Sequence, residues 1–158
     1  MTIISKRMTV ELEETKVVFL IGLRINKLWK IHQWLHLVLT MPKLLKELRR
    51  QDVPGFISGN MWYGRNILMV QYWDNFKSLE QYAKNNSRSH MPVWTYFNMR
   101  ILSSAAVGVW HETYQIEPGQ FEAIYTNMPR YGLATAGDFI EIDNSGIDSN
   151  ATKRMSTK

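Results

Sequence analysis

The chain has 158 residues, 45% hydrophobic and 21% charged, a composition that predicts one globular domain. It contains no cysteine, which excludes disulfides, cysteine nucleophiles and thiolate metal sites and fits a cytoplasmic location. The net charge is +5, but the basic residues form no compact stripe and no apolar run is long enough to span a bilayer. We therefore expect no nucleic-acid partner and no membrane partner.

The first third of the chain predicts an arm, a strand and a helix. Residues 1–14 are polar and unpatterned and are expected to form a flexible N-terminal arm. Residues 16–24 form a near-continuous apolar run, typical of a strand covered on both faces. Residues 27–51 predict a helix that Pro42 kinks or restarts. Its apolar stripe would be Leu28, Ile31, Leu35, Val38, Leu45 and Leu48.

The middle of the chain predicts a hairpin and two helices. Residues 56–63 and 66–73 are strand-like, and Gly64 suits the first position of a two-residue turn between them. Asp74 or Asn75 is expected to cap a helix that ends near residue 84. A further helix is expected from Ser89 to about Ile101.

The last third predicts a strand over residues 107–116, a loop, a short strand over 138–142 and a disordered polar tail over 143–158. The element order is β-α-β-β-α-β, which predicts an α+β, ferredoxin-like fold with a four-stranded antiparallel sheet and helices on one face. The domain would then span residues 15–142. Its strands are too apolar for the other face to be bare, so we expect two sheets to pair as a homodimer, a dimeric α/β barrel.

The strand VGVWHETYQI, residues 107–116, contains a histidine among β-branched and aromatic residues. Alternation places His111 on one face, and Trp110 and Glu112 on the other. A lone histidine here is either a satisfied core residue or a group that faces a pocket. Glu112 is expected to pair with an arginine or lysine rather than to orient His111.

Three segments resemble a bacterial family of small monooxygenase-like proteins of unknown function, placed in the dimeric α/β-barrel superfamily. The segments are YWDNFKSLEQYAKNNSRSHMPVW, VGVWHETYQI and FEAIYTNMPRYGL. The resemblance covers roughly residues 15 to 140. It implies the ferredoxin-like fold and a small-molecule oxygenase activity, but it carries no established catalytic residue with it. Superfamily members include cofactor-free oxygenases, haem-degrading oxygenases and haem-dependent aldoxime dehydratases.

His111 is the candidate catalytic residue. A neutral imidazole in a pocket between sheet and helices could act as a general base towards a phenolic or enolic substrate, with no cofactor. It could alternatively be the axial ligand of haem b. His90 and, one helical turn later, Trp94 are expected to line the same pocket, although His90 could simply be solvated near a helix start.

The other candidate substrate-binding residues are aromatic or basic. Trp110, Trp62 and Tyr72 would shape the pocket, with ordinary cross-strand aromatic pairing as the alternative. Arg130, in the loop NMPRYG, could meet an anionic group or could be an exposed arginine. His32 and His36 have the i, i+4 spacing of metal ligands but lack a third ligand, so we expect no metal site.

The hypotheses are therefore a cofactor-independent monooxygenase for an apolar or aromatic substrate, a haem enzyme of the aldoxime dehydratase or haem-degrading type, and a non-catalytic binding module. No P-loop, dinucleotide fingerprint or nucleophile triad favours another enzyme class.

Overall fold

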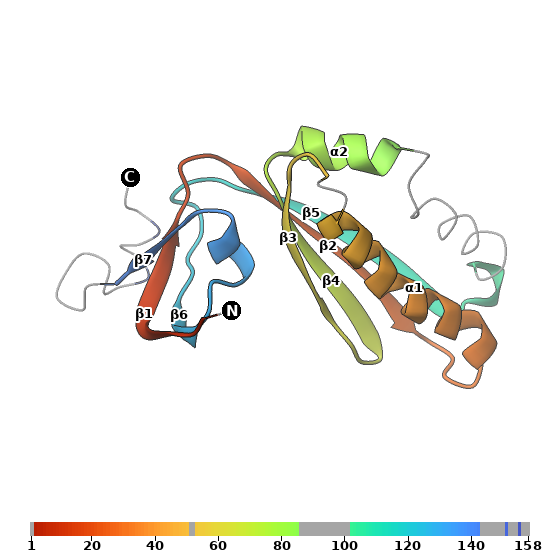
Figure 1. Ribbon diagram of the computed structural model, residues 1–158. Coiled ribbons are helices and arrows are strands. Elements are labelled where there is room, and N and C mark those ends of the chain that lie inside the picture. The colour runs from red at the N-terminus through yellow and green to blue at the C-terminus, as the bar shows by residue number, and fades with distance from the viewer. Residues whose placement is uncertain (1, 51–52, 86–101, 143–150, 152–154, 156–158) are drawn as a thin grey trace.

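The computed structural model describes residues 2–50, 53–85, 102–142, 151 and 155. Two antiparallel sheets lie one after the other along the molecule, and the helices cover the larger one (Figure 1). The predicted helix after residue 89 and most of the predicted tail lie outside the described residues.

The larger sheet has four strands in the order β3-β4-β2-β5. These strands and the helices are β2 (Lys16–Ile25), α1 (Ile31–Arg50), β3 (Phe56–Trp62), β4 (Asn66–Trp73), α2 (Phe76–Lys84) and β5 (Val107–Ile116). All three pairings are antiparallel, and β2, the first of these four strands along the chain, lies between β4 and β5. This topology confirms the ferredoxin-like prediction.

The helices bury one face of this sheet. Leu37, Met41, Leu45 and Leu48 recur every three or four residues of α1 and pack on Leu23, Ile25, Ile67 and Met69, among others. The buried stripe therefore includes Leu45 and Leu48, as predicted, together with Leu37 and Met41. The prediction is wrong for Leu28, Ile31 and Leu35, which are exposed. The helix continues through Pro42, so the predicted restart is wrong.

The side chain of Asn75 caps α2 by accepting a hydrogen bond of 2.9 Å from the Ser78 backbone N–H. This confirms the predicted start of that helix, because an Asn side chain satisfies one of the free N–H groups of the first turn.

The smaller sheet corrects the prediction of a flexible N-terminal arm. Residues Ile4–Glu11 form β1, the central strand between β6 (Tyr125–Met128) and β7 (Asp138–Glu141). Met8, Thr9 and Val10 are buried in succession, as expected of a strand covered on both faces. Both partner strands come from the end of the chain, and so the local sequence of the arm contains no sign of the pairing.

The smaller sheet and the 3₁₀ helix η3 (Gly132–Thr135) pack against one end of the larger sheet, on the side away from α1 (Figure 1). Tyr72 and Ile116 of the larger sheet belong to the cluster formed by Val10, Leu12, Leu133 and Ala134. None of the helices that the structure describes has the length and apolar character that a bilayer crossing requires.

Candidate functional site

Strand register divides the predicted site residues between the two faces of the larger sheet. Ile21 is the cross-strand partner of His111 and of Met69, and these side chains face the helices. The smaller sheet and η3 cover one end of the opposite side, which we call the open face, and this side carries three rows of residues. The rows are Trp62, Leu68, Gly22 and Trp110; Asn60, Val70, Leu20 and Glu112; and Ser58, Tyr72, Val18 and Tyr114.

His111 lies on β5, an edge strand, and its side chain is exposed. Its ring centroid is 5.8 Å from that of Phe19, with the two rings tilted by 46°. An exposed imidazole beside an aromatic ring can reach a small molecule and exchange a proton with it. This is the side of the sheet on which the sequence predicted the pocket.

Trp110, Trp62 and Tyr72 lie on the open face, so they cannot line a helix-side pocket with His111. Trp110 faces Gly22, and Trp62 makes an edge-to-face contact with Tyr131 at a centroid distance of 6.5 Å. The structure therefore separates these three residues from His111. His90 and Trp94 lie outside the described residues.

Glu112 accepts a hydrogen bond of 2.6 Å from the Tyr114 hydroxyl, two residues along the same face of β5. This bond to the carboxylate raises the pKa of the Tyr114 phenol. The prediction that Glu112 points away from His111 is confirmed, and its pairing with an arginine or lysine at the dimer seam or on the rim stays a prediction.

Arg130 holds the turn between β6 and β7. Its Nε–H donates to the carbonyl of Ala134 at 2.6 Å, and a second N–H donates to the carbonyl of Gly137. These bonds account for the arginine without an anionic ligand. Its predicted contact with a substrate anion stays a prediction.

Three tyrosines surround the turn that begins η3. The Tyr125 hydroxyl accepts a hydrogen bond from the Ala134 N–H at 3.3 Å, and the Tyr72 hydroxyl lies beside the same turn, 3.3 Å from the position of a β-carbon added at Gly132. Burial raises the pKa of the Tyr72 and Tyr125 phenols, and Tyr125 and Tyr131 raise that of Tyr72 further. The Tyr125 phenol oxygen therefore acts as an acceptor for a turn that Gly132 opens at φ +62°, and the Tyr72 phenol packs against that turn.

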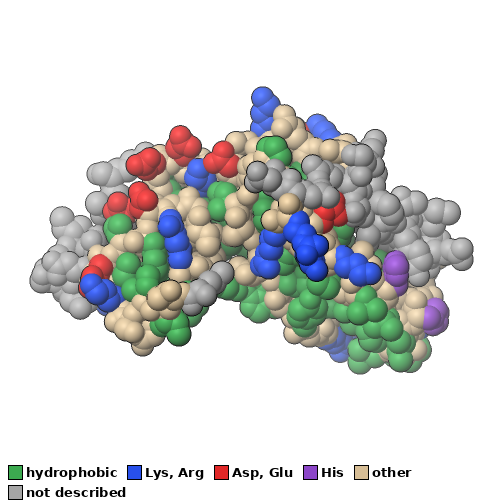
Figure 2. Space-filling model, in the orientation of Figure 1, with side chains coloured by type: hydrophobic (Ala, Val, Ile, Leu, Met, Phe, Trp, Pro, Cys, Tyr) green, Lys and Arg blue, Asp and Glu red, His purple; other side chains and the backbone are tan. Residues whose placement is uncertain are grey.

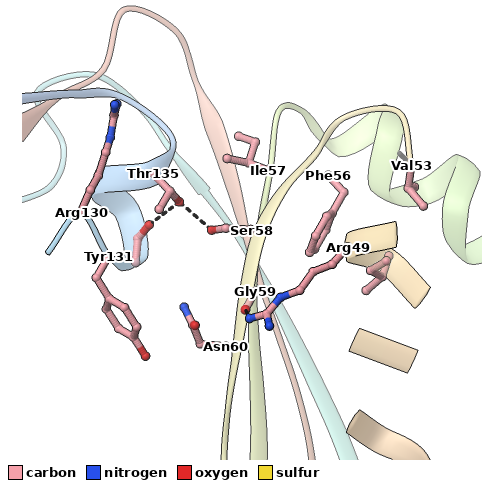
Figure 3. A pocket seen from close by; sticks show the side chains of 12 residues that line it. Arg49, Val53, Phe56, Ile57, Ser58, Gly59, Asn60, Arg130, Tyr131 and Thr135 are labelled. Atoms are coloured by element: carbon pink, nitrogen blue, oxygen red, sulfur yellow. Dashed lines mark hydrogen bonds between the residues drawn. The ribbon is translucent and has the colours of Figure 1, made fainter. Parts of the chain in front are cut away.

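Two adjoining cavities, of about 350 and 430 Å³, form a groove at the edge of β3 that the sequence analysis did not predict. Figure 3 shows the residues that line the first of them. Arg49, Asn60 and Tyr131 line both cavities. An N–H of Arg49 donates to the carbonyl of Gly59, which blocks one pairing group of this edge strand. The groove could not be found from the sequence, because its walls come from α1, β3 and the loop before η3.

A hydrogen bond of 2.6 Å between the Ser58 and Thr135 hydroxyls closes one end of this groove. Since the Thr135 hydroxyl donates to the carbonyl of Gly132 at 2.7 Å, Ser58 must be the donor to Thr135. Neither cavity contains a histidine. The groove therefore offers cationic, amide and phenolic groups, and the imidazole of His111 lies three strands away on β5.

His32 and His36 are exposed on α1. Within the described ranges there is no group of three or more His, Asp or Glu side chains that could hold a metal ion.

Comparison with known proteins identifies relatives of this chain. The sequence model of the Monooxygenase af470-like family matches residues 16–133, which contain all four strands of the larger sheet. Monooxygenase af470 of Aspergillus fumigatus is 31% identical over 86 residues, 51% of this chain and 30% of that protein. The match thus spans less than a third of the curated relative.

One of the matching solved structures shows the same fold at low identity. The aldoxime dehydratase OxdRE, crystallised with butyraldoxime, has a TM-score of 0.66 at 16% identity, covering 95% of this chain and 42% of that one. The cofactor-independent oxygenase SnoaB of Streptomyces nogalater has a TM-score of 0.42 at 10% identity, covering 65% of this chain and 93% of that one. The first match extends beyond the larger sheet.

Proposed function

This chain belongs to the Monooxygenase af470-like family, and we propose that it is an oxidoreductase that oxygenates an apolar or aromatic small molecule without a cofactor. The observation that carries this proposal is the family match over residues 16–133. It fits the resemblance to monooxygenase-like proteins that the sequence motifs indicate.

His111 is the residue to which we assign the proton transfer. Its neutral imidazole would accept a proton from an acidic O–H or C–H of the substrate, and the resulting anion would react with O₂. The imidazolium would then return the proton to the peroxide oxygen, which leaves His111 unchanged. Loss of water from this hydroperoxide would leave one oxygen atom in the product as a carbonyl. Its exposure and the neighbouring ring of Phe19 support this role, because an aromatic substrate can stack there.

A homodimer is the second part of the proposal, with the open face as the contact. Trp62 and Trp110, at the two ends of one row, are 45% and 37% exposed, and Leu68 lies between them with Gly22. An apolar row this wide on a sheet surface is typical of a protein interface. Trp110→Lys would place a charge in that interface, and we expect it to convert the dimer to a monomer in light scattering.

A haem enzyme is the alternative. The fold match with an aldoxime dehydratase, which covers 95% of this chain, supports this alternative. The axial ligand of a haem iron must line an apolar cavity that is large enough for the macrocycle. His111 supplies the ligand type but lines neither cavity, so the described residues do not fit a haem and we derive no step through one.

Oxygen uptake tests the proposal. The purified chain would be assayed with a panel of phenolic and enolic aromatic compounds, and the product examined for incorporated oxygen from ¹⁸O₂. We expect His111→Ala to lower turnover by at least about 100-fold, the usual contribution of a general base. His32→Ala is the matched control, since it removes an exposed histidine from α1.

Full activity in His111→Ala would contradict the assignment of this histidine. Tight retention of a compound with no conversion would contradict the enzyme and support a binding module. An absorption spectrum recorded before and after addition of hemin separates the haem alternative, because only a haem protein would show a Soret band that His111→Ala removes.

A further inference from the structure

Five large apolar side chains are exposed around the first half of α1, and we call them the α1 outer patch. They are Leu28, Trp29, Ile31, Leu35 and Leu39, with exposed fractions from 41% for Leu35 to 75% for Trp29. Figure 2 shows hydrophobic side chains gathered where α1 begins, at the lower right. The patch therefore gathers at the beginning of α1, with Leu28 and Trp29 in the turn before the helix and the other three residues on it.

The patch is additional to the core-facing side of the helix. Ile31, Leu35 and Leu39 are four residues apart and so share one side of α1, while Leu37 and Met41 face the sheet and are buried. A surface helix usually places polar residues on its outer side. The apolar outer side is thus not needed to bury the core, and it points to a binding surface.

The lysines and arginines are the only ionised side chains in the stretch of sequence that contains the patch. No aspartate or glutamate occurs from residue 15 to residue 46 of the sequence. Lys30 precedes the helix, and Lys43 and Lys46 follow the patch along it, with both of the latter exposed. A partner for this surface must therefore present apolar material together with negative charge.

A second copy of this chain fits poorly, because two-fold pairing would place the same lysines against each other. The surface of an anionic bilayer presents both the apolar material and the negative charge that the patch requires. Leucine and tryptophan side chains partition into the boundary between headgroups and acyl chains, and lysines are attracted to acidic headgroups. We propose that the α1 outer patch docks this protein on an anionic lipid surface, with α1 lying in the plane of the interface.

This proposal is independent of the oxygenase reaction, since it rests on α1 alone. It has one structural consequence for the site. His111 and α1 lie on the same side of the larger sheet, so docking would bring that side of the protein towards the lipid.

Vesicle sedimentation of the full chain tests the proposal. We expect binding to vesicles of equal parts phosphatidylglycerol and phosphatidylcholine, and much weaker binding to pure phosphatidylcholine. The double variant Leu35→Ser/Leu39→Ser should lower the partition coefficient by about tenfold or more, because two inserted side chains are lost. The matched control is Ile3→Ser/Ile124→Ser, which alters two exposed aliphatic residues outside α1.

A second variant tests the role of the lysines. Lys43→Gln/Lys46→Gln should weaken binding to the anionic vesicles about tenfold or more, and added salt should also weaken this binding. Lys77→Gln/Lys84→Gln in α2 is the control. It removes the same amount of charge and should weaken vesicle binding less.

Absence of sedimentation with anionic vesicles would overturn the proposal, as would binding that the leucine variant leaves unchanged. Equal binding to neutral and anionic vesicles would overturn the role of the lysines. If the leucine variant instead converts a dimer to a monomer in lipid-free solution, the patch is an interface between copies and the proposal is wrong. Because the lysine variant leaves the apolar residues in place, it tests the idea even if the leucine variant folds poorly.

Discussion

The indole of Trp110 occupies the space above Gly22, its cross-strand partner on the open face. A β-carbon added at Gly22 would lie 2.6 Å from Nε1 of Trp110 and within 2.8 Å of two further ring atoms. The glycine is therefore required by the tryptophan, since any side chain would displace the indole.

Gly22→Ala is expected to destabilise the protein by about 1–3 kcal/mol, the usual cost of overpacking. Urea unfolding measures this change. Gly108→Ala is the control, because the nearest atom to its added β-carbon would be 3.6 Å away. In a Trp110→Ala background the Gly22 substitution should cost much less, and an unchanged cost would show that the indole is not the obstacle.

Trp73 is fully buried and donates its indole N–H to the Gln71 side-chain carbonyl at 2.9 Å. The Gln71 amide in turn contacts the Met69 sulfur at 3.0 Å. Trp73→Phe leaves a buried acceptor unpaired and a void beside it, and we expect a loss of about 2–4 kcal/mol in unfolding free energy. Trp29→Phe, at a position 75% exposed, should cost less than about 1 kcal/mol in lipid-free solution. Equal losses would refute the assignment of Trp73 to the core.

Arg130→Met removes both bonds from the guanidinium to the carbonyls of Ala134 and Gly137. We expect a loss of about 1–3 kcal/mol and faster amide hydrogen exchange over residues 132–137. Arg24→Met is the comparison, since that exposed arginine bonds only the Asn66 side chain among the interactions described here. A variant with unchanged stability and a raised KM would favour the substrate-binding role for Arg130 instead.

Stability should fall as the pH rises above about 10, the ordinary pKa of tyrosine. Burial raises the pKa of Tyr72 and Tyr125 in the folded protein, so the unfolded chain loses these protons first. Their contribution is complete below the unfolded pKa and is lost as the pH rises through the folded pKa. Urea unfolding at pH 8 and at pH 10.5 measures the change.

Tyr72→Phe/Tyr125→Phe should reduce this loss, while Tyr63→Phe, at an exposed position, should not. An equal pH dependence in all three proteins would mean that other groups, such as Lys16 in its contact with Asp74, account for it. The pKa of Lys16 is also raised by its hydrogen bond to Asp74, and its contribution is lost in the same direction.

The ferredoxin-like unit followed from local patterns in the sequence. Apolar runs predicted β2 and β5, the Gly64 turn predicted the hairpin of β3 and β4, and Asn75 marked the start of α2. These signals lie within a few residues of the element that they specify, and the family motifs lie on the same elements. The alternation in residues 107–116 also placed His111 and Glu112 on opposite faces, as the register confirms.

Tertiary structure alone decided which surfaces these elements share. The strand β1 exists because β6 and β7, more than a hundred residues later, supply its hydrogen bonds. The walls of the groove at β3 come from a helix, a strand and a distant loop. The rotation of α1 on its sheet determines which of its apolar side chains face the core and which face the solvent. Local sequence fixes where chain segments begin and end, whereas long-range packing fixes which side chains meet.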